Sequence, residues 1–557
     1  MCIRDREKKV ESGQDLVTWY GELYFELHRG TYTTQAANKR NNRESEILLH
    51  DIEYLATLAT IQNGFGKKSG YKYPKKDIDD MWESVLLCQF HDCLPGSSIE
   101  MCYDDSDAIY AKIFATGKKL LSEAMSELGL SDEAETSHGR IRAINTLSWP
   151  RQEIVKLPSW MDASYGLAQG DGLSTLEVRP LTAPLPASTA SIEEIADNVF
   201  ELRNTQFVVQ VTDGAITSLY DRKVGREVIP KGQKAAQLVI YDDKPLYWQA
   251  WDVEVYHLKS RKELSPTKVS ISENSTHRVS LQIHTQISER SWIKTTMSLP
   301  AAVDDAPTAI EIDAEIEWHE TMRFLKVEFP VDIVNTEASY ETQFGIVRRP
   351  THYNTTWDMA KFEVCVHKWA DLSEATYGVS ILNSNKYGFA TQGNVMRISL
   401  LRAPKAPDAH ADMGKHTTRY AIFPHAGQLN EATVRKAFEF NNPLRITHHT
   451  DTDATLPSFR ISGAPNLIID TIKRGEDDAD VSRSVNTRSA DHSIILRIYD
   501  ALGGKSRGVL SWSGVKVEKV VKVNALEDEG EVLEHKDGSV GIEVRAFEVA
   551  SYKVCVA

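Results

Sequence analysis

The chain has 557 residues, of which 41% are hydrophobic and 26% are charged, as is typical of globular proteins with large buried cores. At about 150 residues per domain, this length predicts three or four domains. The formal net charge of -15, without a long run of Lys and Arg, argues against a nucleic-acid partner, and no apolar run reaches the roughly 18 residues of a membrane span.

The first part of the chain has helical patterns. Residues 42–61 (NRESEILLHDIEYLATLATI) carry apolar side chains at three- and four-residue spacing, which predicts an amphipathic helix. Asp77 is expected to cap the N-terminus of a second helix, and residues 106–128 predict a third. We therefore predict a three-helix bundle that occupies residues 1–130.

The opening residues 1–10 (MCIRDREKKV) resemble neither a signal peptide nor the start of a helix or strand. We interpret them as non-native sequence at the boundary of an incomplete chain. Six cysteines without a CxxC pair indicate reduced thiols rather than a disulfide framework. The cysteine usage therefore favours a cytoplasmic setting.

From about residue 141 the pattern changes to alternating apolar and polar residues rich in Val, Ile and Thr. Segments such as FVVQVTDGAITSLYD and AIEIDAEIEWHE have the two-residue period of half-buried antiparallel strands, and Asp213-Gly214 predicts a hairpin turn. We expect a β-rich connecting domain at 141–190, a large β-sandwich at 196–430 and a C-terminal β-sandwich at 431–557. The predicted fold class is α+β and multidomain, with an N-terminal three-helix bundle followed by large antiparallel β-sandwich domains.

Two adjacent polar residues, His91 and Asp92, follow the apolar segment LLCQF at the end of the second predicted helix. Imidazole and carboxylate both bind zinc, and a catalytic zinc usually takes about three protein ligands. Adjacent helical residues point about 100° apart, so that one would bind a metal while the other contacts substrate or another ligand. Spacing alone favours the alternative, which is a solvated pair at a helix C-terminus.

Three further segments combine aromatic and polar residues in the manner of sugar-binding surfaces. Residues 21–35 (GELYFELHRGTYTTQ) place His28 among three aromatic side chains, which suits stacking on sugar rings. In the β region, loops that extend from a sandwich often contribute to sites. The candidate residues there are Trp248, Asp252, Tyr340 and Gln343. Each segment alone is more often structural.

The segment DAHADMGKH spaces four residues as a metal cluster would, although nothing else in the sequence supports a metal there. The four residues are Asp408, His410, Asp412 and His416.

Three long stretches, in this order, resemble glycoside hydrolase family 38, the class II α-mannosidases, and in particular their cytosolic and fungal vacuolar branch. They are GELYFELHRGTYTTQAANKRNNRESEILLHDIEYLA, LLCQFHDCLPGSSIEMCYDDSDAIYAKI and YETQFGIVRRPTHYNTTWDMAKFEVCVHKWADLSE. The resemblance runs from about Leu23 to the C-terminus. It implies a C-terminal portion that lacks the N-terminal catalytic α/β domain, with a mutarotase-like large sandwich.

The resemblance implies retaining hydrolysis of terminal non-reducing α-D-mannose from N-glycan-derived oligosaccharides, within mannose metabolism. It makes His91 the last ligand of one divalent metal, zinc or alternatively cobalt. The residues that it implies in substrate binding are Asp92, His28, Trp248, Asp252, Tyr340 and Gln343. It places neither catalytic carboxylate in this chain, so we expect the chain alone to be inactive.

The expected partner is a mannose-containing oligosaccharide, without nucleic acid or membrane, and the resemblance implies a homo-oligomer. The implied location is the cytoplasm, with the vacuole as the alternative. A second hypothesis, from another class of function, is a non-catalytic carbohydrate-binding or assembly module.

Overall fold

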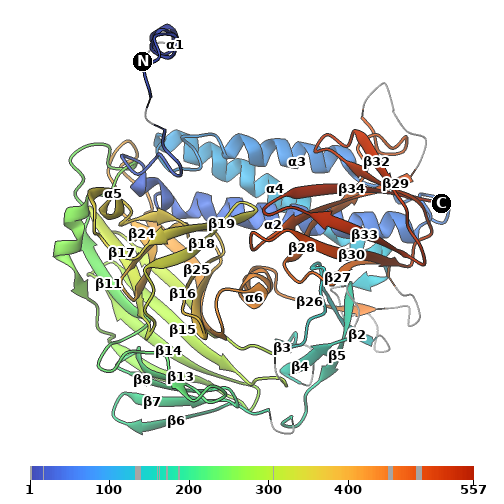
Figure 1. The fold of residues 1–557 in the computed structure, drawn as a ribbon. Helices are drawn as coiled ribbons and strands as arrows, with labels where there is room; N and C mark the ends of the chain where they lie inside the picture. The colour runs from blue at the N-terminus through green and yellow to red at the C-terminus, as the bar shows by residue number, and fades with distance from the viewer. Residues whose placement is uncertain are drawn as a thin grey trace.

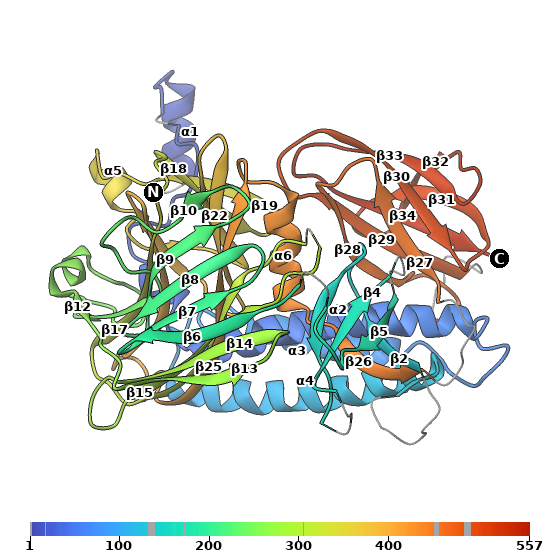
Figure 2. The same ribbon diagram turned by 90° about the horizontal axis from the view of Figure 1, so that it is seen from below.

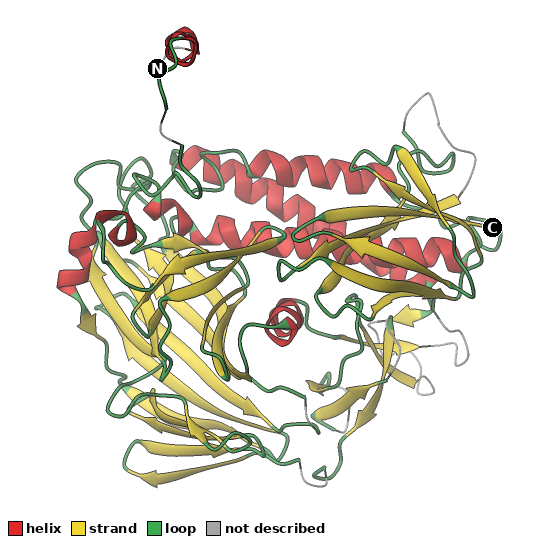
Figure 3. Ribbon diagram, in the orientation of Figure 1, coloured by secondary structure: helices red, strands yellow, loops and turns green. Residues whose placement is uncertain are grey.

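The computed structural model describes residues 3–16, 18–131, 140–159, 161, 163–170, 174–185, 188–304, 306–449, 456–483 and 492–557. Three long helices run side by side along one edge of the molecule, and antiparallel sheets fill the rest (Figures 1 and 3). The predicted α+β fold class is confirmed.

The predicted three-helix bundle is confirmed as α2 (Ala36–Gln62), α3 (Lys75–Cys88) and α4 (Glu100–Glu127). Fully buried apolar side chains of α2, such as Leu49 and Leu55, pack against the other two helices. Each buried side chain of this size stabilises the fold by about 1.5–3 kcal/mol. The remaining helices are η1 (Arg29–Tyr32), η2 (Val255–Ser260), α5 (Thr356–Met359) and α6 (Glu431–Asn441).

The N-terminal residues differ from the prediction, because Ile3–Glu11 forms helix α1. Its sequence, IRDREKKVE, is rich in residues with high helix propensity. It has no apolar face to bury, and α1 stands apart from the body of the molecule (Figure 1). The expectation that this segment forms no helix was wrong.

Two predicted helix starts were also wrong. The N-cap of α3 is Pro74, and Asp77 lies in the first turn, where its carboxylate interacts favourably with the helix dipole. Helix α4 begins at Glu100 rather than at 106. Its first turn exposes Glu100 and Met101, so it lacks the apolar spacing that marks the rest of the helix.

The large β region consists of three antiparallel sheets. The first is β10 (Arg226–Glu227), β9 (Ala215–Asp221), β8 (Phe207–Thr212), β7 (Val199–Arg203) and β6 (Ser191–Ala196). The second is β12 (Lys262–Glu263), β11 (Gln237–Asp242), β17 (Arg323–Pro330), β24 (Val395–Arg402), β23 (Gly388–Gln392) and β20 (Val364–Cys365). The third is β13 (Lys268–Asn274), β14 (Arg278–Gln286), β15 (Trp292–Pro300), β16 (Ile310–Trp318), β25 (Gly414–Ala426), β22 (Tyr377–Asn383), β21 (Trp369–Ser373), β18 (Glu337–Thr342) and β19 (Gly345–Pro350).

The predicted hairpin at Asp213-Gly214 joins β8 to β9 and is confirmed, with Thr212 opposite Ala215. Both turn residues have positive φ, 45° and 76°. This is the backbone that a two-residue type I′ turn requires and that Asp-Gly adopts readily.

The C-terminal part forms two facing sheets, and a further sheet connects the domains. The C-terminal sheets are β27 (Ser458–Ser462), β30 (Ser506–Ser513) and β33 (Ser539–Val544), and β28 (Leu467–Arg474), β29 (His492–Asp500), β34 (Val549–Val556), β31 (Val517–Val523) and β32 (Glu529–Leu533). The connecting sheet is β1 (Leu130–Ser131), β26 (Arg445–His449), β2 (Arg140–Ile144), β5 (Thr175–Pro180), β4 (Tyr165–Gln169) and β3 (Glu153–Lys156). The connecting sheet therefore takes one strand from the range expected for the C-terminal sandwich.

Two cores cross the expected domain limits. One joins the inner faces of the helical bundle to those of the C-terminal sandwich. A second lies around α6, where Phe440 packs in the same cluster as Phe423 of the large sandwich and Tyr499 of the C-terminal sandwich. Figure 2 shows α6 between these two sandwiches.

Candidate functional site

His91 and Asp92 lie in a loop, residues 89–97, that follows the C-terminal end of α3. The His91 side chain is 77% exposed, and its Nε2 atom lies 3.4 Å from Asp92 Oδ2. Its ring packs against that of Phe90, with 4.3 Å between the centroids. His91 therefore presents its imidazole to solvent with one carboxylate beside it.

The base of this loop is fixed by hydrogen bonds around Asp92. Ser97 Oγ donates to Asp92 Oδ1 at 3.1 Å, and Ser97 N donates to the Asp92 carbonyl at 3.1 Å. The Tyr103 hydroxyl donates to the same carbonyl at 3.3 Å. The exposed imidazole thus stands on a loop whose backbone is held in one conformation.

The loop packs closely on the segment that contains His28. At Gly96 a Cβ atom would lie 2.3 Å from the Thr34 carbonyl oxygen, and φ is +87°, so only glycine fits. The buried Lys39 ammonium donates to the carbonyls of Thr34 and Leu94 and ties the two segments together. Burial lowers the Lys39 pKa to about 7.

His28 is exposed and directly precedes η1, which contacts the loop that carries Trp248 and Asp252. Gly30 N donates to the Trp251 carbonyl at 2.7 Å, and Arg29 Nη1 lies 3.2 Å from Asp252 Oδ1. Trp248 is 61% exposed and meets the Trp251 ring edge to face at 5.7 Å. The structure therefore brings together the predicted residues His28, Trp248 and Asp252, with the Asp252 carboxylate already paired.

Buried Arg402 stabilises the contact between η1 and the loop that carries Trp248 and Asp252. It donates from Nε to Asp243 Oδ2 at 2.7 Å, from Nη1 to Thr34 Oγ1 at 2.9 Å and from Nη2 to the Asp252 carbonyl at 2.7 Å. Its side chain is 0% exposed. No sequence pattern marked Arg402, because its partners lie far away in the chain.

Tyr340 and Gln343 occupy different environments. Tyr340 is 1% exposed in β18 and packs under the Arg349 guanidinium, 4.8 Å from the ring centroid, so it belongs to the core of the large sandwich. Gln343, in the β18–β19 turn, lines a cavity of about 490 Å³. Gln89 and Leu94, on either side of His91, line the same cavity. Among the described residues, no hydrogen bond or ion pair joins His91 to His28, Trp248, Asp252 or Gln343.

The DAHADMGKH segment is divided between two roles. Asp412 accepts hydrogen bonds from Gln35 N at 2.8 Å and Ala36 N at 2.6 Å, and so caps α2. The His416 Nε2 atom bonds to the Asp412 carbonyl at 2.7 Å. The four residues therefore do not converge on one point.

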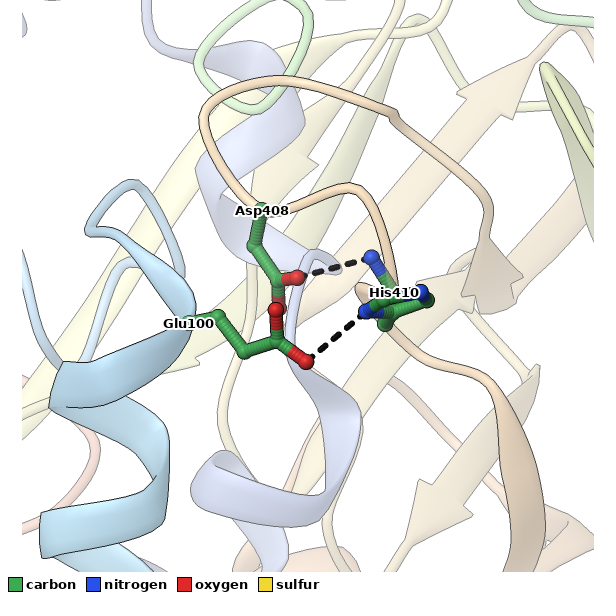
Figure 4. A group of neighbouring side chains, drawn as sticks. All are labelled: Glu100, Asp408 and His410. Carbon is green, nitrogen blue, oxygen red and sulfur yellow. Dashed lines mark hydrogen bonds and ion pairs between the residues drawn. The ribbon is translucent and has the colours of Figure 1, made fainter.

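Asp408 and His410 instead lie beside Glu100, with donor atoms within 4.8 Å of one another (Figure 4). His410 Nδ1 is 2.8 Å from Glu100 Oε1, and Asp408 accepts from Gln35 Nε2 at 2.6 Å. Within the described ranges this is the one group of three possible metal ligands.

Among the described helices, none combines the length and the hydropathy of a membrane-spanning segment.

Three family models match the chain. The alpha mannosidase middle domain matches residues 26–128, the glycosyl hydrolases family 38 C-terminal domain matches 202–410, and the family 38 C-terminal beta sandwich domain matches 466–552.

Among related proteins, an alpha-mannosidase of Saccharomyces cerevisiae is 42% identical over 98% of this chain and 49% of its own length. Alpha-mannosidase 2C1 of Homo sapiens is 37% identical over 88% of this chain and 46% of its own. The chain thus spans about half the length of the curated relatives that it matches. A crystal structure of an alpha-mannosidase from Enterococcus faecalis has the same fold, with a TM-score of 0.73 over 99% of this chain and 72% of its own at 16% identity.

The family resemblance seen in the sequence is confirmed by these matches, which cover both the helical bundle and the sandwiches. The chain belongs to glycosyl hydrolase family 38, of which it carries the middle domain, the C-terminal domain and the C-terminal β-sandwich domain.

Proposed function

We propose that this chain is part of a metal-dependent α-mannosidase that removes terminal non-reducing α-D-mannose from N-glycan-derived oligosaccharides with retention of configuration. The observation that carries the proposal is the His91 imidazole, 77% exposed on a hydrogen-bonded loop beside a carboxylate. Membership of family 38 supplies the class of reaction.

His91 fits the metal as one ligand of a larger set. Its Nε2 atom and Asp92 Oδ2, 3.4 Å apart, are donors that a zinc or cobalt ion accepts. The described residues offer no third His, Cys, Asp or Glu at this point, whereas a catalytic zinc takes about three protein ligands. When bound, such an ion acts as a Lewis acid toward substrate oxygen. We assign neither catalytic carboxylate to the described residues.

The other residues of the site bind and orient the sugar in this proposal. The Asp92 carboxylate, about half exposed, accepts hydrogen bonds from mannose hydroxyls. Trp248 offers an exposed aromatic face for the apolar C–H side of a pyranose ring, and His28 lies on the adjoining segment. The described cysteines form no disulfide with one another, which supports a cytoplasmic location.

The test compares His91→Ala with His410→Ala in the complete product of the gene. His410 is a matched control, because it is also an exposed histidine beside a carboxylate, with a side chain 66% exposed. We expect His91→Ala to lose bound zinc, measured by mass spectrometry of the metal, together with hydrolysis of an aryl α-mannoside. His410→Ala should keep both.

Two results would contradict the proposal. Full zinc content and turnover in His91→Ala would remove His91 from the metal site. Loss of zinc in His410→Ala alone would assign the metal to the Glu100, Asp408 and His410 group instead (Figure 4).

A further inference from the structure

A cavity of about 490 Å³ lies between the helical bundle and the two sandwiches. Its walls come from the buried face of α2, the end of α3, the β18–β19 turn, α6 and β28. This volume falls in the range of about 300–1,000 Å³ that is usual for small-molecule sites. Leu86 and Phe344, which line it, are 60% and 44% exposed, so the cavity opens to solvent on that side.

The cavity wall contains a buried cation with an unsatisfied donor. Arg43 is 5% exposed and stacks on the Tyr387 ring, with 4.8 Å between the guanidinium carbon and the centroid. Its Nε donates to Tyr387 Oη at 3.1 Å, and its Nη1 makes long bonds of 3.4 Å to Ser384 O and Asn441 Oδ1. Its Nη2 is buried and has no hydrogen-bond partner among the described residues. The guanidinium in the wall places a positive charge beside the cavity, which favours acceptor oxygens on a ligand.

The charges around Arg43 disfavour an anionic ligand. Carboxylates outnumber cations in the lining: Glu46, Glu53, Glu341 and Asp470 stand against Arg43 and Lys368. Lys368 is already paired with Glu341, at 2.8 Å. A second anion would be repelled, whereas hydroxyl groups can both donate to the carboxylates and accept from Arg43.

Aromatic side chains supply the apolar part of the wall. Trp82, Phe344 and Phe438 line the cavity from three different elements. Phe344 is held edge to face by Tyr499, with 5.4 Å between the ring centroids. Aromatic faces combined with carboxylates, amides and an arginine match the alternating apolar faces and hydroxyl edges of a pyranose.

We propose that this cavity is a second binding site, for a neutral pyranose or short neutral oligosaccharide. Neither His91 nor Asp92 lines it, although Gln343, one of the residues predicted to bind the substrate, does. The inference is drawn from the cavity lining and does not rest on the proposed metal or on hydrolysis at His91.

The experiment measures binding of methyl α-D-mannopyranoside and maltose to the 557-residue chain, with citrate as the anionic comparison. Saturation-transfer NMR detects the bound sugar. We expect Phe344→Ala and Arg43→Met to weaken binding of at least one neutral sugar tenfold or more. The matched control is Phe547→Ala: Phe547 is 45% exposed and has φ +57°, close to Phe344 at φ +53°, but lies outside the lining.

Phe547→Ala should bind the sugar as the unmodified chain does. Phe344→Ala keeps the result interpretable if Arg43→Met does not fold, because Phe344 is half exposed. The proposal is overturned if no neutral sugar binds, if citrate binds instead, or if His91→Ala abolishes sugar binding while Phe344→Ala does not. Zinc content measured on the same His91→Ala protein reports separately on the proposed function.

Discussion

Burial decides the charge of His257, which lies on η2 among aromatic rings of the large sandwich. Its side chain packs near Tyr241, Phe324 and Phe362, with centroid distances of 5.1 to 5.8 Å. Nδ1 donates to the Glu254 carbonyl at 2.8 Å, while Nε2 is buried without a partner in the described structure. Burial, reinforced by the charge of Lys326, lowers the pKa of His257 to about 3.

We predict that His257 makes the large sandwich sensitive to acid. In the unfolded chain its pKa is about 6.5, so between pH 6.5 and 3 the unfolded state binds a proton that the folded state does not. Stability from this group is complete above pH 6.5 and falls as the pH drops, by about 2 kcal/mol at pH 5. In His257→Phe, urea unfolding followed between pH 7 and pH 5 should show a shallower loss of stability. Equal slopes in the two proteins would contradict the prediction.

For single residues, the sequence predicted several members of the candidate site but not the residues that contact them in the folded chain. His91 was recognisable because an adjacent His-Asp pair within a long family-like stretch is specific. Glu100 was not, because it reaches His410 across 310 positions of the chain. Arg43 was missed for a related reason: it lies on a helix face that has no apolar pattern and is buried against Tyr387, far away in sequence.

At the scale of elements, the N-terminus of α2 depends on a residue far away in the chain. The prediction started this helix at 42, whereas it begins at Ala36. Asn38 and Lys39 are buried against backbone carbonyls, so their segment shows no apolar periodicity. Its N-cap residue, Gln35, makes no side-chain cap, and the Asp412 carboxylate supplies the cap. Periodicity therefore predicted the later turns of α2 and could not predict the first two.

Removing this cap should loosen α2 locally. Asp412 has φ +60°, which glycine and asparagine adopt readily, so Asp412→Gly deletes both acceptor oxygens without straining the backbone. We expect α2 to lose about 1–3 kcal/mol of local stability, and Asp412→Asn to lose less. Hydrogen exchange of the amides in the first turns of α2 measures this loss.

The matched control is Asp537→Gly, at φ +51°, where the aspartate side chain is 86% exposed. Its effect should stay within about 0.5 kcal/mol. Equal protection of α2 in Asp412→Gly and in the unmodified chain would show that the cap does not stabilise the helix.

At the scale of the whole molecule, sequence patterns predicted the kinds of domain but not how they share cores. Alternation identifies a strand without identifying its partner, so β26 could not be assigned to the connecting sheet from its sequence. Likewise, the apolar stripe of α2 predicts a buried face and leaves open what covers it. In the structure, β28 and β29 of the C-terminal sandwich contribute to the same core as α2 and α4.

Because they share one core, we predict that the helical bundle and the C-terminal sandwich unfold as one cooperative unit. Leu55 of α2 is 1% exposed in this core, and Leu281 of β14 is 0% exposed in the separate core of the large sandwich. Each change to alanine should cost about 2–5 kcal/mol, because it leaves a cavity in a packed interior. In Leu55→Ala, hydrogen exchange should accelerate in α2–α4 and in β28–β34 to the same degree, since both lose one core. In Leu281→Ala, acceleration should be confined to the large sandwich. Faster exchange in the helices alone after Leu55→Ala would mean that the two parts unfold independently, although their apolar side chains touch.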